Sequence, residues 1–299
     1  MTSIAPRDAP LTQFIAPALN RPQLWRTVAG LVLASVLYIL AIQIVIAGLA
    51  VILGPGATVQ VLKDMAQGAT KGGLVALLFS YLPLTAAVAL VMSLLLKRGF
   101  LTVFGPIRPA LRCFVWVAGP LLVLCALLVP LSVNAVNVVR HLTLGQQAPW
   151  LPLALLGLLV QTGTEEIIFR GYLLQQLAVR FRSRLVWMVL PSVLFGALHY
   201  SPAQYGATAW FVVIWAMLFG LAAADLTART GNLGAAMGLH FANNASGLLM
   251  VGLARHMDGM ALYSTVLDMT DAAAQLPYLA IDTVTLLVGY LAARLILRV

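Results

Sequence analysis

Charged side chains are scarce in this chain of 299 residues. Asp, Glu, Lys and Arg together make up 9% of the sequence, whereas apolar residues make up 62% and the mean hydropathy is +0.97. Soluble globular domains carry about 25% charged residues, so the composition excludes a soluble domain. It predicts an all-α fold, a polytopic membrane helical bundle.

Cysteine is nearly absent as well. The two copies, Cys113 and Cys125, fall inside one apolar run, which indicates buried small side chains rather than a disulfide framework or a metal knuckle. The net charge of +9 could suggest nucleic-acid binding, but the basic residues are scattered between apolar runs and form no amphipathic basic face. The distribution argues against nucleic acid as a partner.

The signatures of the common hydrolases are missing too. The sequence contains no His-Glu-x-x-His zinc-protease motif and no Gly-x-Ser-x-Gly nucleophile elbow. Neither cysteine has a histidine at a recognisable spacing. Serine or cysteine catalysis therefore has little support, and any metal site would need ligands from separate helices.

Long apolar runs dominate what is present. A spanning helix needs about 20 apolar residues, and eight stretches qualify or nearly qualify, the fifth being short and interrupted by Pro191. The eight are roughly 27–53, 73–96, 112–139, 150–177, 185–200, 207–224, 232–253 and 276–297. We expect a polar N-terminal tail at 1–26 and one transmembrane domain of about eight helices at 27–299.

The distribution of Lys and Arg predicts the orientation. If the N-terminus is cytoplasmic, thirteen basic residues fall on the cytoplasmic side and four on the other, with Arg170 left inside a helix. This excess favours a multi-pass integral membrane protein with both termini in the cytoplasm.

The only two glutamates of the chain, Glu165 and Glu166, are adjacent and lie inside an apolar stretch. Ionisable residues at membrane depth are costly, so such a pair is a functional-site hypothesis by default. On a helix, Glu166 and Arg170 share a face and can pair, whereas Glu165 points about 100° away and needs a partner from elsewhere. An ion pair that only fixes helix packing would explain Glu166 but not Glu165.

Two further polar stripes lie in the apolar stretches that follow. If the chain turns at Arg182, Glu166 lies 16 residues before the turn and His199 lies 17 after it. Both would then sit about 24 to 26 Å from the turn, level with each other. His240 and Asn244 are four apart and share a helical face, among small residues that let a neighbouring helix approach closely. Either stripe could also serve only to join helices, through hydrogen bonds worth about 0.6 to 2 kcal/mol each.

Together these side chains suffice for hydrolysis. A carboxylate and an imidazole can activate a water molecule directly or through a bound metal. A second imidazole and a carboxamide can stabilise the oxyanion that forms on the scissile carbonyl.

The three motifs stand as Glu165-Glu166-Ile-Ile-Phe-Arg170, Phe195-Gly-Ala-Leu-His199 and His240-Phe-Ala-Asn-Asn244, in a core region at about 151–253. In this order they resemble the motifs of the CPBP intramembrane proteases, also called the CAAX-processing and bacteriocin-processing, or Abi, family. The rest of the chain is generic.

The resemblance implies an all-helical fold of about eight spans and an endopeptidase that cleaves a membrane-bound protein or peptide substrate in the lipid bilayer. It assigns Glu165 and His199 to activating the attacking water, and His240 and Asn244 to the oxyanion or to metal binding. The ion pair of the first motif would support the site. If a metal is used, Zn²⁺ or another divalent cation would be held by Glu165, His199 and His240.

Two other functions fit some of these residues. A proton-coupled transporter would use the carboxylates and histidines as a relay, but it would favour inverted repeats, and the polar residues gather only in the second half. A non-proteolytic membrane partner or immunity protein would keep the motifs for folding alone.

Overall fold

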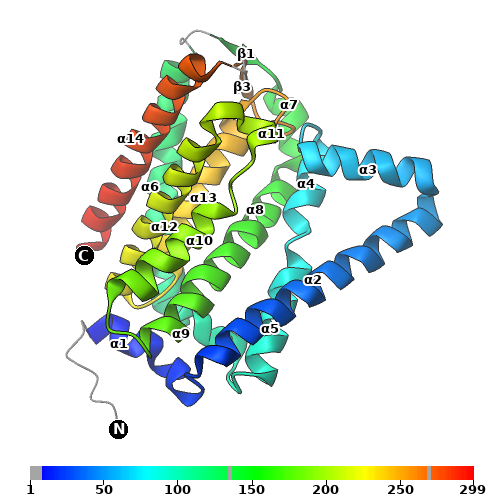
Figure 1. Cartoon of the computed structure of the whole chain (residues 1–299). Coiled ribbons are helices and arrows are strands. Elements are labelled where there is room, and N and C mark those ends of the chain that lie inside the picture. Colours follow the sequence, from blue (N-terminus) through cyan, green and yellow to red (C-terminus); the bar gives the residue numbers. More distant parts are fainter. Residues whose placement is uncertain (1–8, 134–136, 268–270) are drawn as a thin grey trace.

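A computed structural model describes residues 9–133, 137–267 and 271–299, and almost all of its regular structure is helical (Figure 1). Arg7, at the start of the expected tail, and residues 134–136 of the third apolar stretch lie outside the described residues. Among the described residues, six helices are long and apolar enough to cross a membrane: Leu24–Leu53, Lys71–Leu94, Ile107–Leu131, Leu144–Ala178, Pro202–Thr230 and Ala272–Leu297. The predicted all-α polytopic bundle is confirmed.

The other two predicted spans are shorter helices. The fifth stretch forms an apolar helix at Leu185–Ala197, which ends in α10 (Leu190–Ala197). The seventh forms α13 (Gly234–Ala245), continued by the π-helical η7 (Ser246–Met250). Most of α13 is buried, because neighbouring helices cover it. A helix covered in this way need not match the thickness of the bilayer by itself.

The centre of the bundle is α8 (Leu151–Glu166), which continues through the π-helical η4 (Ile167–Leu174) into α9 (Gln175–Ala178). It contacts α4 (Lys71–Phe79), α5 (Leu82–Leu94) and α13. The expected close approach at the small residues of α13 is present, and the neighbour is α6 (Ile107–Val133). A Cβ on Gly238 would lie 2.8 Å from the carbonyl oxygen of Phe114, so only glycine fits at that crossing.

One end of the bundle carries a small sheet that the sequence did not predict. Strands β1 (Val138–Arg140), β2 (Val251–Leu253) and β3 (Tyr263–Thr265) are ordered β1-β3-β2, with β1 antiparallel and β2 parallel to β3. We call this the sheet end, and it also holds α7 (Leu144–Gln147) and α11 (Pro202–Tyr205) (Figure 1). The buried Gln147 side chain donates to the carbonyl oxygens of Leu249 (2.7 Å) and Met260 (2.8 Å) and so ties the sheet to the bundle.

The opposite end collects the loops and helix ends that hold most of the basic residues, and we call it the basic end. It contains α1 (Ala9–Ile15), η1 (Ala16–Asn20), α9, η2 (Phe100–Phe104) and the turn before Leu185, and α12 (Ala209–Thr230) and α14 (Ala272–Leu297) run down to it (Figure 1). The positive-inside rule predicts that this end is cytoplasmic. Within the expected polar tail, α1 is not loose, because Leu11, Phe14 and Ile15 are buried in the core.

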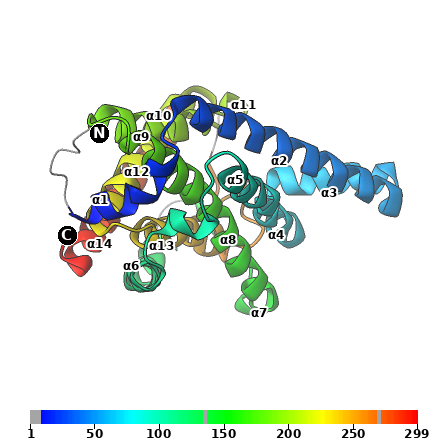
Figure 2. The same ribbon diagram turned by 90° about the horizontal axis from the view of Figure 1, so that it is seen from below.

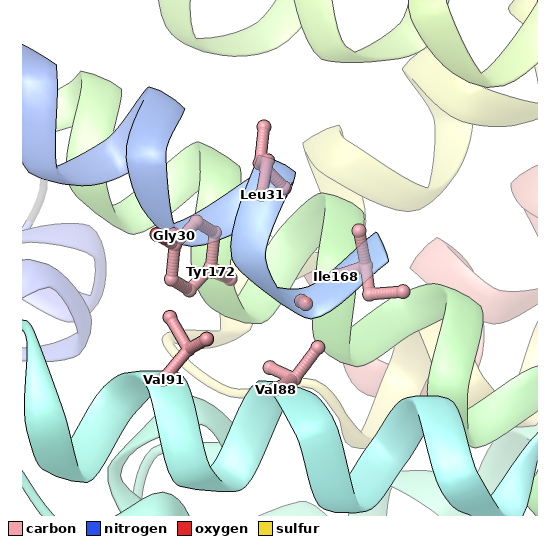
Figure 3. Close-up of a pocket in the computed structure, with 7 residues that line it drawn as sticks. Gly30, Leu31, Val88, Val91, Ile168 and Tyr172 are labelled. Atoms are coloured by element: carbon pink, nitrogen blue, oxygen red, sulfur yellow. The ribbon is translucent and has the colours of Figure 1, made fainter. Parts of the chain in front are cut away.

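Helix α2 (Leu24–Leu53) diverges from the bundle, and α3 (Pro55–Gln67) leads the chain back to α4 (Figures 1 and 2). The only buried residues of α2 are Thr27, Gly30 and Ala34. There α2 crosses α5 and η4 around a small apolar cavity of about 10 Å³ (Figure 3). The Tyr172 hydroxyl donates to the carbonyl oxygen of Thr27 at 3.0 Å, and a Cβ on Gly30 would clash with it. This crossing attaches α2 to the bundle.

Candidate active site

The three motifs meet at one cavity of about 50 Å³ in the middle of the bundle. Its lining comes from α8, α10, α12 and α13 and consists of Gln161, Glu165, Phe195, His199, Trp215, Phe219, His240, Asn243 and Asn244. A cavity of about 10 to 15 Å³ already holds one water molecule when polar groups line it. The structure therefore places Glu165 and His199 beside a space that accommodates water.

Glu166 and Arg170 lie next to this cavity but do not line it. Arg170 Nη1 donates to Glu166 Oε1 at 3.0 Å, and both side chains are almost completely buried. The predicted i,i+4 pair is thus present. The same Glu166 oxygen also lies 2.8 Å from His240 Nδ1, so the pair is joined to the third motif.

The contact with Glu166 determines the tautomer of His240. An ionised carboxylate only accepts hydrogen bonds, so Nδ1 of His240 carries a proton. In the neutral ring, Nε2 then has a lone pair, and it lies 3.6 Å from Glu165 Oε2. If this ring gains a second proton, the imidazolium lies between the two carboxylates.

Glu165 is held by an amide rather than by a cation. Gln161 Nε2 donates to Glu165 Oε1 at 2.6 Å, and Asn244 Nδ2 donates to Gln161 Oε1 at 2.9 Å. The other carboxylate oxygen, Oε2, is buried and has no hydrogen-bond partner. Glu165 therefore has one oxygen that Gln161 orients and one buried oxygen without a hydrogen-bond partner.

His199 follows the last turn of α10 and is oriented by Phe195. Its Nδ1 donates to the Phe195 carbonyl oxygen at 2.8 Å, which can only accept, so Nε2 carries the lone pair of the neutral ring. The two rings lie 4.8 Å apart, and the Arg170 guanidinium lies 4.8 Å from the centroid of the same Phe195 ring. The four-residue spacing of this motif thus has a physical reason. His199 and Glu165 line the same cavity but form no ion pair with each other.

Residues 147–246, which contain all three motifs, match the sequence model of a family described as type II CAAX prenyl endopeptidase Rce1-like. These residues are therefore similar to that family over about a third of the chain. The predicted resemblance to the CPBP proteases is thereby confirmed, and it supports an intramembrane endopeptidase and an integral membrane location at a general level. The chain is also similar to the uncharacterized protein YyaK of Bacillus subtilis (strain 168), with 29% identity over 248 residues, covering 78% of this chain and 80% of YyaK. No solved structure matches the chain significantly.

Some residues of the candidate active site were not predicted. Gln161 is four residues before Glu165, and the i,i+4 rule would have found it once a helix was assumed. Trp215, Phe219 and Asn243 line the cavity without any motif to mark them. Tyr81 interacts with Glu165 from the break between α4 and α5, outside residues 147–246. Sequence spacing carries no signal for that contact.

The candidate active site does not fit a bound metal as its side chains stand. Within the described ranges, no group of three or more His, Cys, Asp or Glu side chains is arranged to hold a metal ion. Of the three candidate ligands, Glu165 and His240 approach to 3.6 Å, but His199 makes no ion pair with Glu165. The chemistry below therefore uses no step through a metal.

Proposed function

We propose that the protein is an intramembrane endopeptidase that hydrolyses a peptide bond of a membrane-bound protein or peptide with a water molecule activated by Glu165. One observation carries the proposal. Glu165 Oε2 is buried without a hydrogen-bond partner at a cavity with room for water, while Gln161 holds Oε1.

The first step is attack by water. A water molecule in the cavity donates one proton to Glu165 Oε2 and a hydrogen bond to the lone pair of His199 Nε2. The hydroxide then attacks the scissile carbonyl carbon. A positioned general base contributes about 10² to 10⁴ in rate.

The second step is collapse of the tetrahedral intermediate. Its oxyanion needs hydrogen-bond donors that are already in place, and the proposed donors are the Asn244 carboxamide and the protonated His240 ring. When the C–N bond breaks, the proton held by Glu165 passes to the leaving amine. The hydroxyl proton of the new carboxyl group then passes to the amine, so the products are a carboxylate and an ammonium group, and the enzyme regains its ionised glutamate.

Glu166 has a supporting role in this proposal. Its Oε1 accepts from both Arg170 and His240, and Glu166 does not line the cavity, so it is not placed to accept a proton from water there. It fixes the His240 tautomer and lowers the cost of a positive charge on that ring, much as a second-shell carboxylate orients a catalytic histidine.

The decisive experiment uses the purified full-length protein in lipid vesicles with a membrane-anchored peptide. A prenylated CAAX peptide is the first substrate to test, because the matching family is described by that activity. Wild-type protein is expected to cleave it, and Glu165→Gln to lose cleavage while remaining folded in detergent. Asp225→Asn, which disrupts an ion pair on α12 outside the site, is the matched control.

Two results would contradict the proposal. Undiminished cleavage by Glu165→Gln would exclude this base. Loss of cleavage on chelation, restored by Zn²⁺, would contradict the metal-free route. A Glu165→Gln variant that still rescues a deletion strain would instead favour a non-proteolytic membrane partner.

A further inference from the structure

Buried polar atoms without a hydrogen-bond partner gather in only two places in the described part of the chain. There are eleven such atoms, and four belong to the site described above. The other seven all lie at the basic end: Arg21 Nε, Gln23 Oε1, Arg26 Nε, Arg98 Nε and Nη2, and Gln176 Nε2 and Oε1. Native proteins pair nearly all buried polar groups, so a concentration of exceptions calls for an explanation.

These five residues, which we call the arginine cluster, come from three segments that meet at the basic end. Arg26 Nη1 donates to the carbonyl oxygen of Leu95 at 2.9 Å, which joins the start of α2 to the end of α5. Arg98 Nη1 donates to Gln175 Oε1 at 2.6 Å, which joins the α5–η2 loop to α9. Helix α9 also contacts η1 and α2, and Gln176 belongs to it. Figure 1 shows these elements together at its lower edge.

Arg98 is the most buried arginine of the cluster, with only 8% of its surface exposed. Within the described residues, no Asp or Glu lies at ion-pair distance from it. Burial without a counter-ion lowers the pKa of Arg98 to about 10, which still leaves the side chain charged at neutral pH. A buried, unpaired charge is costly unless an anion compensates it. Two of its nitrogen atoms remain to bind one.

The outer members of the cluster lie at a surface suited to lipid headgroups. Arg21, Gln23 and Arg26 are only partly buried, so the cluster is open on that side. The neighbouring Trp25 is 59% exposed, and its ring lies 4.5 Å from the Arg26 guanidinium carbon. Exposed tryptophan is typical of the membrane–water interface, and basic pockets between membrane helices bind anionic headgroups.

The cluster also contains acceptors that a phosphate alone would not satisfy. The side-chain oxygens of Gln23 and Gln176 are buried and unpaired. The ionised phosphodiester of a lipid carries no proton and cannot donate to them, but a hydroxyl group on the headgroup can. The combination of three guanidinium groups with two unpaired amide oxygens therefore favours a headgroup that carries both a phosphate and hydroxyls.

We propose that the arginine cluster binds the phosphate of an anionic, hydroxyl-bearing lipid headgroup such as phosphatidylglycerol, with Arg98 as its most buried arginine ligand. The site is separate from the cavity that holds Glu165, and the proposal does not depend on proteolysis. Lipid bound there would hold the start of α2 against α9 and the α5–η2 loop.

The test measures lipid binding to the purified full-length protein in detergent by native mass spectrometry and by thermal shift. The probes are short-chain phosphatidylglycerol, phosphatidylcholine of the same chain length, and inorganic phosphate. Wild-type protein is expected to retain and be stabilised by phosphatidylglycerol. Arg98→Gln should weaken that binding about tenfold or more, because hydrogen bonds to charged groups are lost.

Arg26→Gln is the second variant, and it keeps the test sharp if Arg98→Gln fails to fold. Arg180→Gln is the matched control, because it removes the same charge from an exposed position at the same end. Equal affinity for phosphatidylglycerol and phosphatidylcholine would overturn the proposal, as would equal weakening by Arg180→Gln. Stabilisation by inorganic phosphate as strong as that by the lipid would overturn the headgroup assignment.

Discussion

Gln161 Nε2 lies 2.6 Å from Glu165 Oε1, and the Gln161 amide oxygen accepts from Asn244 at 2.9 Å. The two amides form a chain that links the third motif to the first glutamate. Because an amide carries no net charge, Gln161 fixes the rotamer of Glu165 without neutralising its charge. Arg170, by contrast, forms an ion pair with Glu166. Gln161 is thus a positioning residue for the proposed base.

We expect Gln161→Leu to lower kcat about tenfold with little change in KM. Leucine keeps the volume but removes the hydrogen bond that orients the carboxylate, and a net hydrogen bond to a charged group is worth about 1.5 to 3 kcal/mol. Initial rates on the membrane-anchored peptide measure this. Gln60→Leu, on α3, is the matched control. A rise in KM with kcat unchanged would show that Gln161 contacts substrate instead.

Glu166→Gln should destabilise the protein by about 3 to 5 kcal/mol, since it leaves the buried Arg170 charge without its counter-ion. Thermal unfolding in detergent measures the loss. Arg229→Gln breaks another i,i+4 pair whose guanidinium side is 38% exposed, and it should cost no more than about 1 kcal/mol. Similar losses for both variants would contradict the burial argument.

The crossing of α2 gives a prediction with an internal control. Gly30→Ala should cost about 1 to 3 kcal/mol, because the new methyl group meets the Tyr172 hydroxyl. Gly48→Ala lies on the same helix with nothing within 4 Å of the added Cβ, and it should stabilise by about 0.5 to 1 kcal/mol. Tyr172→Phe removes the clashing oxygen and should reduce the cost of Gly30→Ala. Additive effects of these two changes would contradict the contact.

His256, at the sheet end, predicts a dependence of stability on pH. Burial lowers its pKa, the nearby Asp258 opposes that shift, and its ring contacts the Gln204 side chain. The unfolded chain therefore binds a proton more readily than the folded one. Stability is unaffected above the ordinary pKa of about 6.5 and falls as the pH drops below it. His256→Asn should reduce the change in the midpoint of thermal unfolding between about pH 5 and 7. An unchanged slope would exclude this residue as the cause.

The sequence predicted the parts of the site that depend on short spacings. Glu166 and Arg170 pair because they are four residues apart on a helix. His199 lines the same cavity as Glu165 after a turn near Arg182. The π-helical segment at Ile167–Leu174 was not predictable, because its wider turn changes the helical register directly after the glutamates.

Long-range contacts were beyond the sequence for a different reason. The partner of His240 is Glu166, and that contact depends on how closely α13 approaches α8. The strands β1 and β3 have 3 residues each and come from distant segments, so they are too short to show the alternation of apolar and polar residues that predicts a strand. A single transmembrane domain at 27–299 and cytoplasmic termini stay predictions.

The divergence of α2 has a mechanical consequence. Its 30 residues span about 45 Å, whereas a hydrocarbon core is about 30 Å thick. The helix can therefore stay in the apolar layer only by leaning, and past Ala34 none of its residues is buried by protein. The tilt of α2 is set at one end by its crossing at Gly30 and along the rest by the surrounding acyl chains. The thickness of the membrane therefore affects the tilt of α2 relative to the bundle.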